Sequence, residues 1–169
     1  AHTARTTAAG TAERHRPFPA VKVKILGDGP DRQRLEELAR QENAPVDFLG
    51  YQDHGSMAAW LRASDITVNS LVKSAVQSIV TKIGDYLASG KPMINTGSSP
   101  EFRNKVTTDG FGLNVEAENP EALADVLEEL ARTPSLRKIM GARGRAVAER
   151  EFDQRTSYLA IVNLLRNLI

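Results

Sequence analysis

Residues 78–97, SIVTKIGDYLASGKPMINTG, contain the side chains whose types and spacing most directly suggest chemistry. A helix that begins near Thr81 would present free backbone N–H groups and a partial positive charge at its first turn, which suits a diphosphate. Lys82 would add a full positive charge beside those groups. The structural alternative is that Thr81 caps the helix and Lys82 is solvated, and the local sequence does not separate the two interpretations.

Asp85 is a single carboxylate within an otherwise apolar helical stretch, IGDYLA. A carboxylate so placed can accept two hydrogen bonds from a vicinal diol such as a ribose. The alternative is an interaction with the helix dipole, or a salt bridge, near the start of the helix. The sequence therefore offers both a ligand-binding role and a purely structural role for Asp85.

Turns elsewhere in the chain carry weaker signals. Gly27 and Gly29 follow an expected strand in GDGPD and could let the backbone approach a phosphate or a nucleoside. No third glycine completes G-x-G-x-x-G, and Pro30 has no N–H to donate, so a tight turn is the simpler interpretation. His54 in GYQDHG is either a polar ligand contact or a solvated loop side chain, and Glu101 either caps its helix or contacts a substrate.

Composition and absent motifs exclude several classes of function. The chain has no cysteine, which rules out disulfides and thiolate metal sites and is compatible with a cytoplasmic location, and its three histidines are far apart, so no metal site is expected. A net charge of +1 gives no reason to expect nucleic acid as a partner. No P-loop, H-E-x-x-H or Ser-His-Asp pattern is present, so hydrolysis by a self-contained set is not predicted and no catalytic residue is assigned.

The elements that must position these residues alternate along the chain. Asn119 and Thr133, each followed by Pro, are predicted helix caps. Apolar strands are expected at residues 21–26, 46–50, 66–70, 92–96 and 111–115. Helices are expected at residues 32–42, 56–64, 120–132 and 134–152, and two more are expected to begin near Thr81 and after Asp153. A helical turn is expected at residues 99–106. This alternation predicts an α/β fold, a Rossmann-like parallel sheet flanked by helices on both faces, with ligands at the carboxyl ends of the strands.

The expected organisation has three parts. Residues 1–20 are poor in large aliphatic side chains and are interpreted as a tail or a weak helix, residues 21–152 as the Rossmann-like domain, and residues 153–169 as a terminal helix. No apolar run approaches the roughly 20 residues that a membrane-spanning helix needs, and the N-terminus lacks a signal-peptide pattern. Because the chain does not begin with Met, we expect a processed product or a piece of a longer protein.

Five segments, taken in order, resemble a known family. They are KILGDGPDRQRLEELA, VDFLGYQDHGSMAAWLRASDITVNS, TKIGDYLASGKPMINTG, PEFRNKVTTDGFGLNVEAENPEALADVLEEL and RKIMGARGRAVAEREFD. Together they resemble the C-terminal, donor-binding half of retaining group 1 glycosyltransferases with the GT-B fold, over roughly residues 21–158. The resemblance implies transfer of a sugar from a nucleoside-diphosphate sugar to a surface polysaccharide or glycoconjugate.

The resemblance also implies roles for individual residues. The turn at residues 51–54 is similar to the family's nucleobase contact, residues 78–82 to its diphosphate cradle, and Asp85 to the Glu that binds the ribose hydroxyls. The implied donor site comprises Gly27, Gly29, Gln52, His54, Gln77, Ser78, Ile79, Val80, Thr81, Lys82 and Asp85. This donor site is expected to need no metal ion and no cofactor, and its substrate is expected to be a UDP- or GDP-sugar. The helix after Asp153 resembles the family's segment that crosses back onto an N-terminal domain.

The chain departs from the family pattern in three places. Gln77 stands where the family usually has a Glu near the donor sugar, and Asp85 is one bond shorter than the usual Glu. Residues 1–20 contain no counterpart of the family's first strand or of the basic pair that grips the diphosphate. We therefore expect the chain alone not to transfer sugar efficiently and to need an acceptor-binding N-terminal domain or subunit, with peripheral membrane association of the whole enzyme as a further expectation.

Two other classes of function were weighed against a glycosyltransferase donor-binding domain. The first is a non-catalytic or split-subunit interaction domain that pairs with an acceptor-binding partner, which the missing strand and the apolar terminal helix motivate. The second is a sugar-nucleotide epimerase of the same architecture, which would need an acid and base pair that the sequence does not provide.

Overall fold

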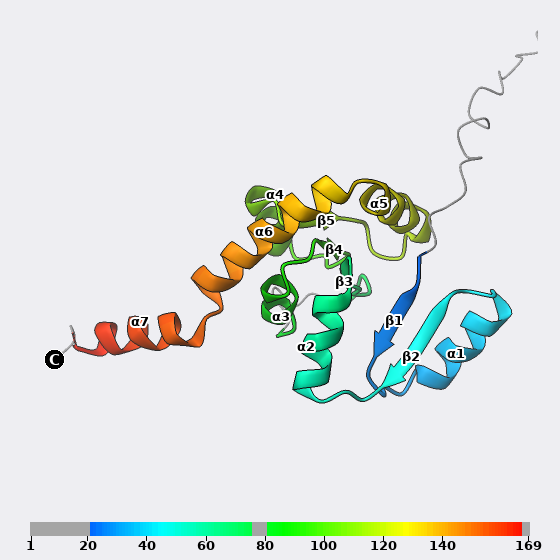
Figure 1. Ribbon diagram of the computed structural model, residues 1–169, viewed down its shortest axis with the longest axis horizontal. Coiled ribbons are helices and arrows are strands. Elements are labelled where there is room, and N and C mark those ends of the chain that lie inside the picture. Colours follow the sequence, from blue (N-terminus) through cyan, green and yellow to red (C-terminus); the bar gives the residue numbers. More distant parts are fainter. Residues whose placement is uncertain (1–20, 76–80, 167–169) are drawn as a thin grey trace, which may run out of the picture.

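The strands and helices alternate along the chain as predicted. The computed structural model describes residues 21–75 and 81–166, so the expected tail at residues 1–20 and four of the expected site residues lie outside it (Figure 1). The strands are β1 Val23–Leu26, β2 Val46–Gly50, β3 Thr67–Asn69, β4 Met93–Asn95 and β5 Gly112–Asn114. The helices are α1 Arg32–Gln41, α2 His54–Ala63, α3 Ile83–Ala88, α4 Pro100–Asp109, α5 Pro120–Arg132, α6 Pro134–Glu151 and α7 Gln154–Arg166.

The strands are parallel, but they do not form one continuous sheet. β1 pairs with β2, and β3, β4 and β5 pair in that order, so the structure contains two hydrogen-bonded sheets. In Figure 1 the strands follow one another in the order β5, β4, β3, β1, β2. The expected parallel α/β fold is therefore confirmed, whereas its expected single sheet is interrupted between β3 and β1.

Helices cover both faces of the β3–β4–β5 sheet. Consecutive side chains of a strand point to opposite faces, so neighbouring residues of one strand pack against different helices. Met93 of β4 is buried with residues of α3, α4 and α6, whereas its neighbour Ile94 is buried on the other face with residues of α5 and α6. The predicted inner face of α5 packs there as expected, through Leu123, Val126, Leu127 and Leu130. In the two ranges that the structure describes, no helix is long and apolar enough to cross a membrane.

Two glycines permit the closest approaches within this part of the molecule. A Cβ at Gly112 of β5 would lie 2.0 Å from the backbone oxygen of Met93, and a Cβ at Gly141 of α6 would lie 2.0 Å from that of Gly90. Because real Cβ atoms do not approach oxygen so closely, only glycine lets β5 pair with β4 and lets α6 pack against the end of α3.

Helix termini differ in part from the prediction. The side chain of Asn119 accepts a hydrogen bond from Ala122 N at 3.0 Å, so this cap is confirmed. Thr133 makes no side-chain cap bond, so this predicted cap is wrong; the residue ends α5 and begins α6, and its N–H donates to Leu130 O. α3 begins at Ile83 with Lys82 at the N-cap, so the alternative in which Thr81 caps the helix is wrong.

The expected helical turn at residues 99–106 is a full helix, α4, because Ser99 supplies an N-cap and Pro100 starts the helix. The oxygen of Ser99 accepts a hydrogen bond from Phe102 N at 3.3 Å. Ser99 therefore supplies the N-cap of this helix, and Glu101 lies in its first turn.

Candidate functional site

The candidate site lies at the carboxyl ends of the strands, where a parallel α/β sheet binds its ligands. Two groups of residues meet this description. One group follows β1 and β2, at residues 27–31 and 50–54, and the other follows β3, β4 and β5 and includes α3.

The first group joins the two turns that were expected to contact a nucleoside. Gly27 N donates to Gly50 O at 2.7 Å, and Tyr51 N donates to the Asp28 carboxylate at 2.7 Å. Asp28 also pairs with Arg32 in the first turn of α1. The hydrogen bond from Arg32, and then that from Tyr51 N, hold the pKa of Asp28 below its ordinary value. The structure thus brings residues 27–29 and residues 51–54 together, as the prediction requires.

The two glycines of the first turn leave its surface open. Gly27 adopts φ +125°, which side chains rarely adopt, and a Cβ added at Gly27 or Gly29 would meet no atom within 4 Å. The turn is therefore held from one side by Asp28 and is unobstructed at both glycines. This geometry suits a tight turn and leaves room for a ligand beside it.

The second turn differs from the prediction at His54. Gln52 is half-buried, and its Nε2 donates to Leu49 O of β2 at 2.8 Å. The side-chain amide nitrogen of Gln52 is therefore already hydrogen-bonded within the protein. His54 is the first residue of α2 rather than a loop residue, and it is exposed. The reason is Asp53, whose carboxylate accepts from Ser56 N at 3.0 Å and Ser56 Oγ at 2.7 Å and so caps the helix.

Lys82 is a half-buried cation at the start of α3. Its Nζ lies 5.7 Å from the centre of the Tyr86 ring, within range of a cation–π interaction. Burial lowers the pKa of Lys82, and burial followed by the charge of Asp85 raises the pKa of Tyr86. Lys82 is therefore not a fully solvated side chain, and that alternative is wrong.

Asp85 faces a pocket between α3 and the C-terminal end of α6. The pocket has a volume of about 390 Å³ and is lined by Thr81, Gly84, Asp85, Ala88, Arg145, Ala148, Glu149, Phe152 and Asp153. The Asp85 carboxylate forms no salt bridge with any residue in the described ranges, although it lies in the first turn of α3. This counts against the salt-bridge alternative and leaves the helix-dipole role and the ligand role open.

Four predicted site residues, Gln77, Ser78, Ile79 and Val80, lie outside the described residues. The predicted site residues that the structure does describe form two clusters. One contains Gly27, Gly29, Gln52 and His54, and the other contains Thr81, Lys82 and Asp85.

A ladder of three asparagines, which the sequence interpretation missed, ends the second sheet. Asn69, Asn95 and Asn114 are the last residues of β3, β4 and β5 and are paired in register. Asn69 Nδ2 donates to Asn95 Oδ1 at 2.8 Å, and Asn95 Nδ2 donates to Asn114 Oδ1 at 2.9 Å. The repeated Asn in VNS, INT and LNV was the available signal, and it predicts polar groups at the carboxyl edge.

The ladder fixes the loop between β4 and α4. Asn95 Oδ1 also accepts from Gly97 N at 3.1 Å, and the Thr96 hydroxyl bridges to the β3 side by accepting from Leu71 N at 2.7 Å and donating to Leu71 O at 2.8 Å. On the other side, Asn114 Nδ2 donates to Arg103 O at 2.9 Å. The polar side chains at the carboxyl edge of this sheet thus hydrogen-bond to one another and to the adjoining loops.

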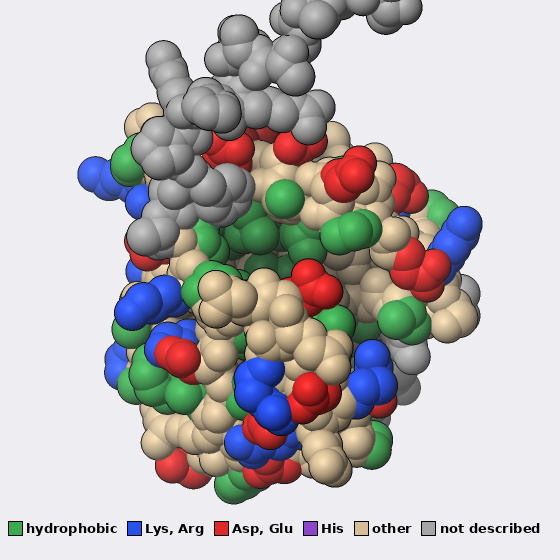
Figure 2. Space-filling model, turned by 90° about the vertical axis from the view of Figure 1, so that its right-hand side faces the viewer, with side chains coloured by type: hydrophobic (Ala, Val, Ile, Leu, Met, Phe, Trp, Pro, Cys, Tyr) green, Lys and Arg blue, Asp and Glu red, His purple; other side chains and the backbone are tan. Residues whose placement is uncertain are grey.

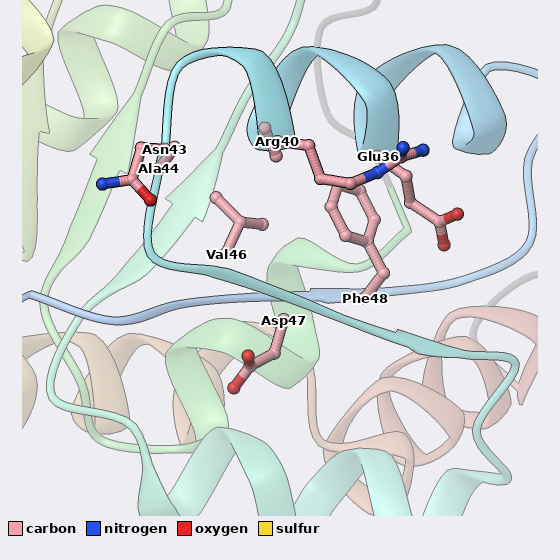
Figure 3. Close-up of a pocket in the computed structure, with 8 residues that line it drawn as sticks. Glu36, Arg40, Asn43, Ala44, Val46, Asp47 and Phe48 are labelled. Carbon is pink, nitrogen blue, oxygen red and sulfur yellow. The ribbon is translucent and has the colours of Figure 1, made fainter.

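Another pocket, of about 560 Å³, lies between α1 and β2 (Figure 3). In that view Val46 and Phe48 point toward α1, whereas Asp47 points to the opposite face of β2, where it pairs with Lys24. None of the predicted site residues lines this pocket. It is therefore separate from the candidate site.

Comparison with known families gives a match over most of the chain. The family model described as "Glycosyl transferases group 1" matches residues 6–133. A GDP-mannose-dependent monoacylated alpha-(1-6)-phosphatidylinositol monomannoside mannosyltransferase from Corynebacterium glutamicum is 30% identical over 155 residues, covering 88% of this chain and 40% of that protein. A lipopolysaccharide core biosynthesis glycosyltransferase from Rhizobium meliloti is 30% identical over 152 residues, covering 88% and 42%. The chain thus spans about 40% of the length of these curated relatives.

Solved structures share the fold. A sucrose-phosphate synthase from Thermosynechococcus elongatus superposes with a TM-score of 0.72 at 24% identity, covering 87% of this chain and 38% of that one. The HepE protein of Anabaena, solved in complex with UDP, superposes with a TM-score of 0.73 at 20% identity, covering 88% and 42%. Identities this low establish a likeness of fold alone, and that fold is the one found in GT-B glycosyltransferases.

Proposed function

Because the chain belongs to the group 1 family of glycosyltransferases, we propose that it is the donor-binding domain of a retaining enzyme of that family. The enzyme transfers a sugar from a nucleoside-diphosphate sugar to a surface polysaccharide or glycoconjugate. The observation that carries the proposal is the 30% identity, over 88% of the chain, to two relatives whose names describe sugar transfer to a phosphatidylinositol mannoside and in lipopolysaccharide core synthesis.

The proposed donor lies across the carboxyl ends of the strands. The nucleoside contacts the open turn at Gly27 and Gly29 and the backbone near Gln52, with His54 at the edge of the base. Unobstructed glycines beside a turn held by Asp28 support this placement, because a planar ring needs close approach to the backbone. A relative named as GDP-mannose-dependent and a neighbour solved with UDP support a UDP- or GDP-sugar.

The proposed diphosphate lies beside Lys82 and the chain that precedes α3. A half-buried ammonium attracts a phosphate more strongly than a solvated one, since less water screens the interaction. When the bond between the sugar and the diphosphate breaks, negative charge grows on the departing diphosphate, and Lys82 stabilises that charge. Asp85 has no salt-bridge partner within the described ranges, so its carboxylate is free to accept hydrogen bonds from the two ribose hydroxyls.

A partner completes the enzyme in this proposal. α7 exposes five large apolar side chains, at Tyr158, Leu159, Val162, Leu164 and Leu165. Apolar surface of this extent is typical of an interface, which favours an acceptor-binding domain or subunit against α7. The same surface is the observation that favours the second candidate function, a non-catalytic subunit that only pairs with such a partner.

Calorimetric titration of the folded chain with UDP, GDP, UDP-glucose and GDP-mannose tests the proposal. We expect binding to at least one of them, and we expect Asp85→Asn to weaken that binding by about tenfold or more, since hydrogen bonds to a charged group contribute about 1.5–3 kcal/mol. Asp125→Asn, which changes an exposed carboxylate on α5, is the matched control. Absence of binding to all four ligands, or equal affinity of the Asp85→Asn and Asp125→Asn variants, would reject the donor-binding assignment.

A further inference from the structure

Glu118 has a backbone conformation that a side chain of its kind rarely adopts. Its φ is +62°, and within the described ranges Asn43 is the only other non-glycine residue with a positive φ. Asparagine tolerates this left-handed region because its short polar side chain can bond locally, whereas glutamate has no such compensation. Glycine would make the same turn without cost. Strain of this kind persists where the surrounding structure requires it, and it often marks a functional site.

The chain on both sides of Glu118 is fixed by the fold. Directly after β5, Val115 N donates to Asn95 O at 2.9 Å. On the other side, the side chain of Asn119 caps α5. The chain must pass from one anchor to the other through residues 116–118, and the positive φ completes this tight turn. The fold therefore requires the turn, but it does not require glutamate in the turn.

The Glu118 carboxylate reaches the loop that follows β3, residues 70–75, which we call the β3 loop. Its Oε1 accepts a hydrogen bond from Lys73 N at 3.3 Å. Within the β3 loop, Ala75 N donates to Val72 O at 2.9 Å and closes a turn around Lys73. Val72 and Lys73 are exposed, so this turn is not held in place by burial of its tip. Hydrogen bonds must hold it instead.

Side chains from the neighbouring loops hold alternate residues of the β3 loop. The Thr96 hydroxyl, directly after β4, accepts from Leu71 N at 2.7 Å and donates to Leu71 O at 2.8 Å. Ser98 Oγ, in the same loop as Thr96, donates to Ala75 O at 3.3 Å. Glu118 holds the residue midway between Leu71 and Ala75. In the part of the chain that the structure describes, these side chains join the β3 loop to the loops after β4 and β5.

The β3 loop lies where the proposed function places the donor. It follows the carboxyl end of β3, and the chain continues from it toward Lys82, the N-cap of α3. Ligands of parallel α/β sheets bind at these strand ends. A loop that is already held in its binding conformation loses less conformational entropy when a ligand binds, so the affinity is higher. The hydrogen bonds to the β3 loop can therefore contribute to donor binding without any contact with the donor.

We propose that Glu118 is a positioning residue of the donor site, which holds the β3 loop in its binding conformation before the donor arrives. The hydrogen bond to Lys73 N fixes the middle of the loop, and the positive φ of Glu118 is the backbone strain that accompanies this contact. Glu118 acts through the loop and does not itself touch the donor. This inference rests on the proposed donor-binding function and adds to it a residue that follows β5, at the outer edge of the second sheet.

Two variants of Glu118 and one matched control test the proposal. Glu118→Gly relieves the positive φ and removes the carboxylate, whereas Glu118→Gln keeps a side-chain oxygen that can accept from Lys73 N. Asn43→Gly is the control, because it relieves the other positive φ away from the donor site. Asn43 lines the pocket between α1 and β2, and these two elements lie on the right-hand side of Figure 1, the side that Figure 2 shows.

Affinity and stability should change in different directions. Calorimetric titration with UDP, GDP, UDP-glucose and GDP-mannose gives the affinity, and urea denaturation gives the stability. We expect Glu118→Gly to weaken donor binding by about threefold to tenfold, the worth of one hydrogen bond, and Glu118→Gln to restore most of that loss. Asn43→Gly should bind like the unaltered chain. The urea midpoints of both glycine variants should equal or exceed that of the unaltered chain, because glycine adopts a positive φ without strain.

Amide hydrogen exchange tests the contact without any ligand. We expect the Lys73 amide to exchange at least about threefold faster in Glu118→Gly than in the unaltered chain, since an amide that has lost its hydrogen-bond acceptor is less protected. Glu118→Gln should exchange at an intermediate or unaltered rate. Equal exchange at Lys73 in the unaltered chain and in Glu118→Gly overturns the contact on which the proposal depends.

The binding results separate this inference from the proposed function. Equal affinity of the unaltered chain and Glu118→Gly overturns the positioning role alone. A Glu118→Gly variant that loses affinity and urea midpoint together also overturns it, because Glu118 would then support the fold in general. Absence of binding by the unaltered chain to all four ligands rejects the donor-binding function, and with it any role of Glu118 toward a donor.

Discussion

The region from β3 to α6 and the region from β1 to α2 have the same alternation of strand and helix but very different interiors. Within the described residues, every buried hydrophobic side chain lies between Ile83 and Ala148. Neither α1 nor α2 has a single buried residue, and β1 is half exposed. The local sequence therefore forms secondary structure in both regions, whereas only one of them has the neighbours that turn secondary structure into a closed core.

The two regions also contribute differently to the proposed donor site. The first region supplies the open turns at residues 27–29 and 51–54, held mainly by hydrogen bonds at the surface. The second supplies Lys82 and Asp85 on a helix whose Ile83 and Leu87 are fully buried. A site shared in this way combines an adaptable half for the nucleoside with a fixed half for the charged groups, because surface turns open more readily than buried helices.

The largest expected contrast comes from truncating one phenylalanine in each region. Phe111 is fully buried between helices, so Phe111→Ala should lower the free energy of unfolding by about 3–5 kcal/mol. Phe48 is half-buried on β2, so Phe48→Ala should cost about 1 kcal/mol. Urea denaturation followed by circular dichroism measures both. Equal losses for the two variants would contradict the described difference in core closure.

A smaller contrast is expected from the side-chain amides. Asn95→Ala removes the centre of the asparagine ladder and leaves Asn69 Nδ2 and Asn114 Oδ1 without the partner that they have in the ladder, which should cost about 1–3 kcal/mol. Gln52→Ala removes one hydrogen bond, to Leu49 O, in the open region and should cost about 0.5–1.5 kcal/mol. The same denaturation experiment applies, and a Gln52→Ala variant less stable than Asn95→Ala would refute the ranking.

The smallest effect expected is the pH dependence of the turn at Asp28. Its pKa is lowered by the hydrogen bond from Arg32 and then by that from Tyr51 N, so the folded chain binds this proton less readily than the unfolded chain. The stabilisation is therefore present above the ordinary pKa of an Asp and is lost as the pH falls below about 4. Asp28→Asn should remove that part of the pH dependence, measured as the change in urea midpoint between pH 6 and pH 3. An unchanged pH dependence would show that the carboxylate is not held in the turn.

The secondary structure and the fold class could be predicted because their signals are local. Apolar strands followed by turns, and Pro after Asn119, mark most of the elements within a few residues. Two local signals were available but missed: Asp53 followed by Ser56, which makes His54 helical, and Ser99 before Pro100, which makes α4 a full helix.

The rest depends on contacts between distant segments. The interruption between β1 and β3 follows from which strands pair, and the asparagine ladder from the register in which three strands pair, neither of which a single strand encodes. The pocket at Asp85 needs the end of α6 beside α3, which rests on the contact between Gly141 and Gly90. A sequence pattern marks Asp85 as unusual but cannot place the side chains that surround it.

The claim that one donor site draws on both regions is tested most directly by nuclear magnetic resonance. Backbone amides of the labelled chain are followed while UDP-glucose or GDP-mannose is added. The account predicts concerted shifts at residues 27–29 and 51–54 in the open region and at Lys82 and Asp85 in the closed region, with one affinity for all of them. Shifts confined to the pocket between α1 and β2, or to one region alone, would contradict it.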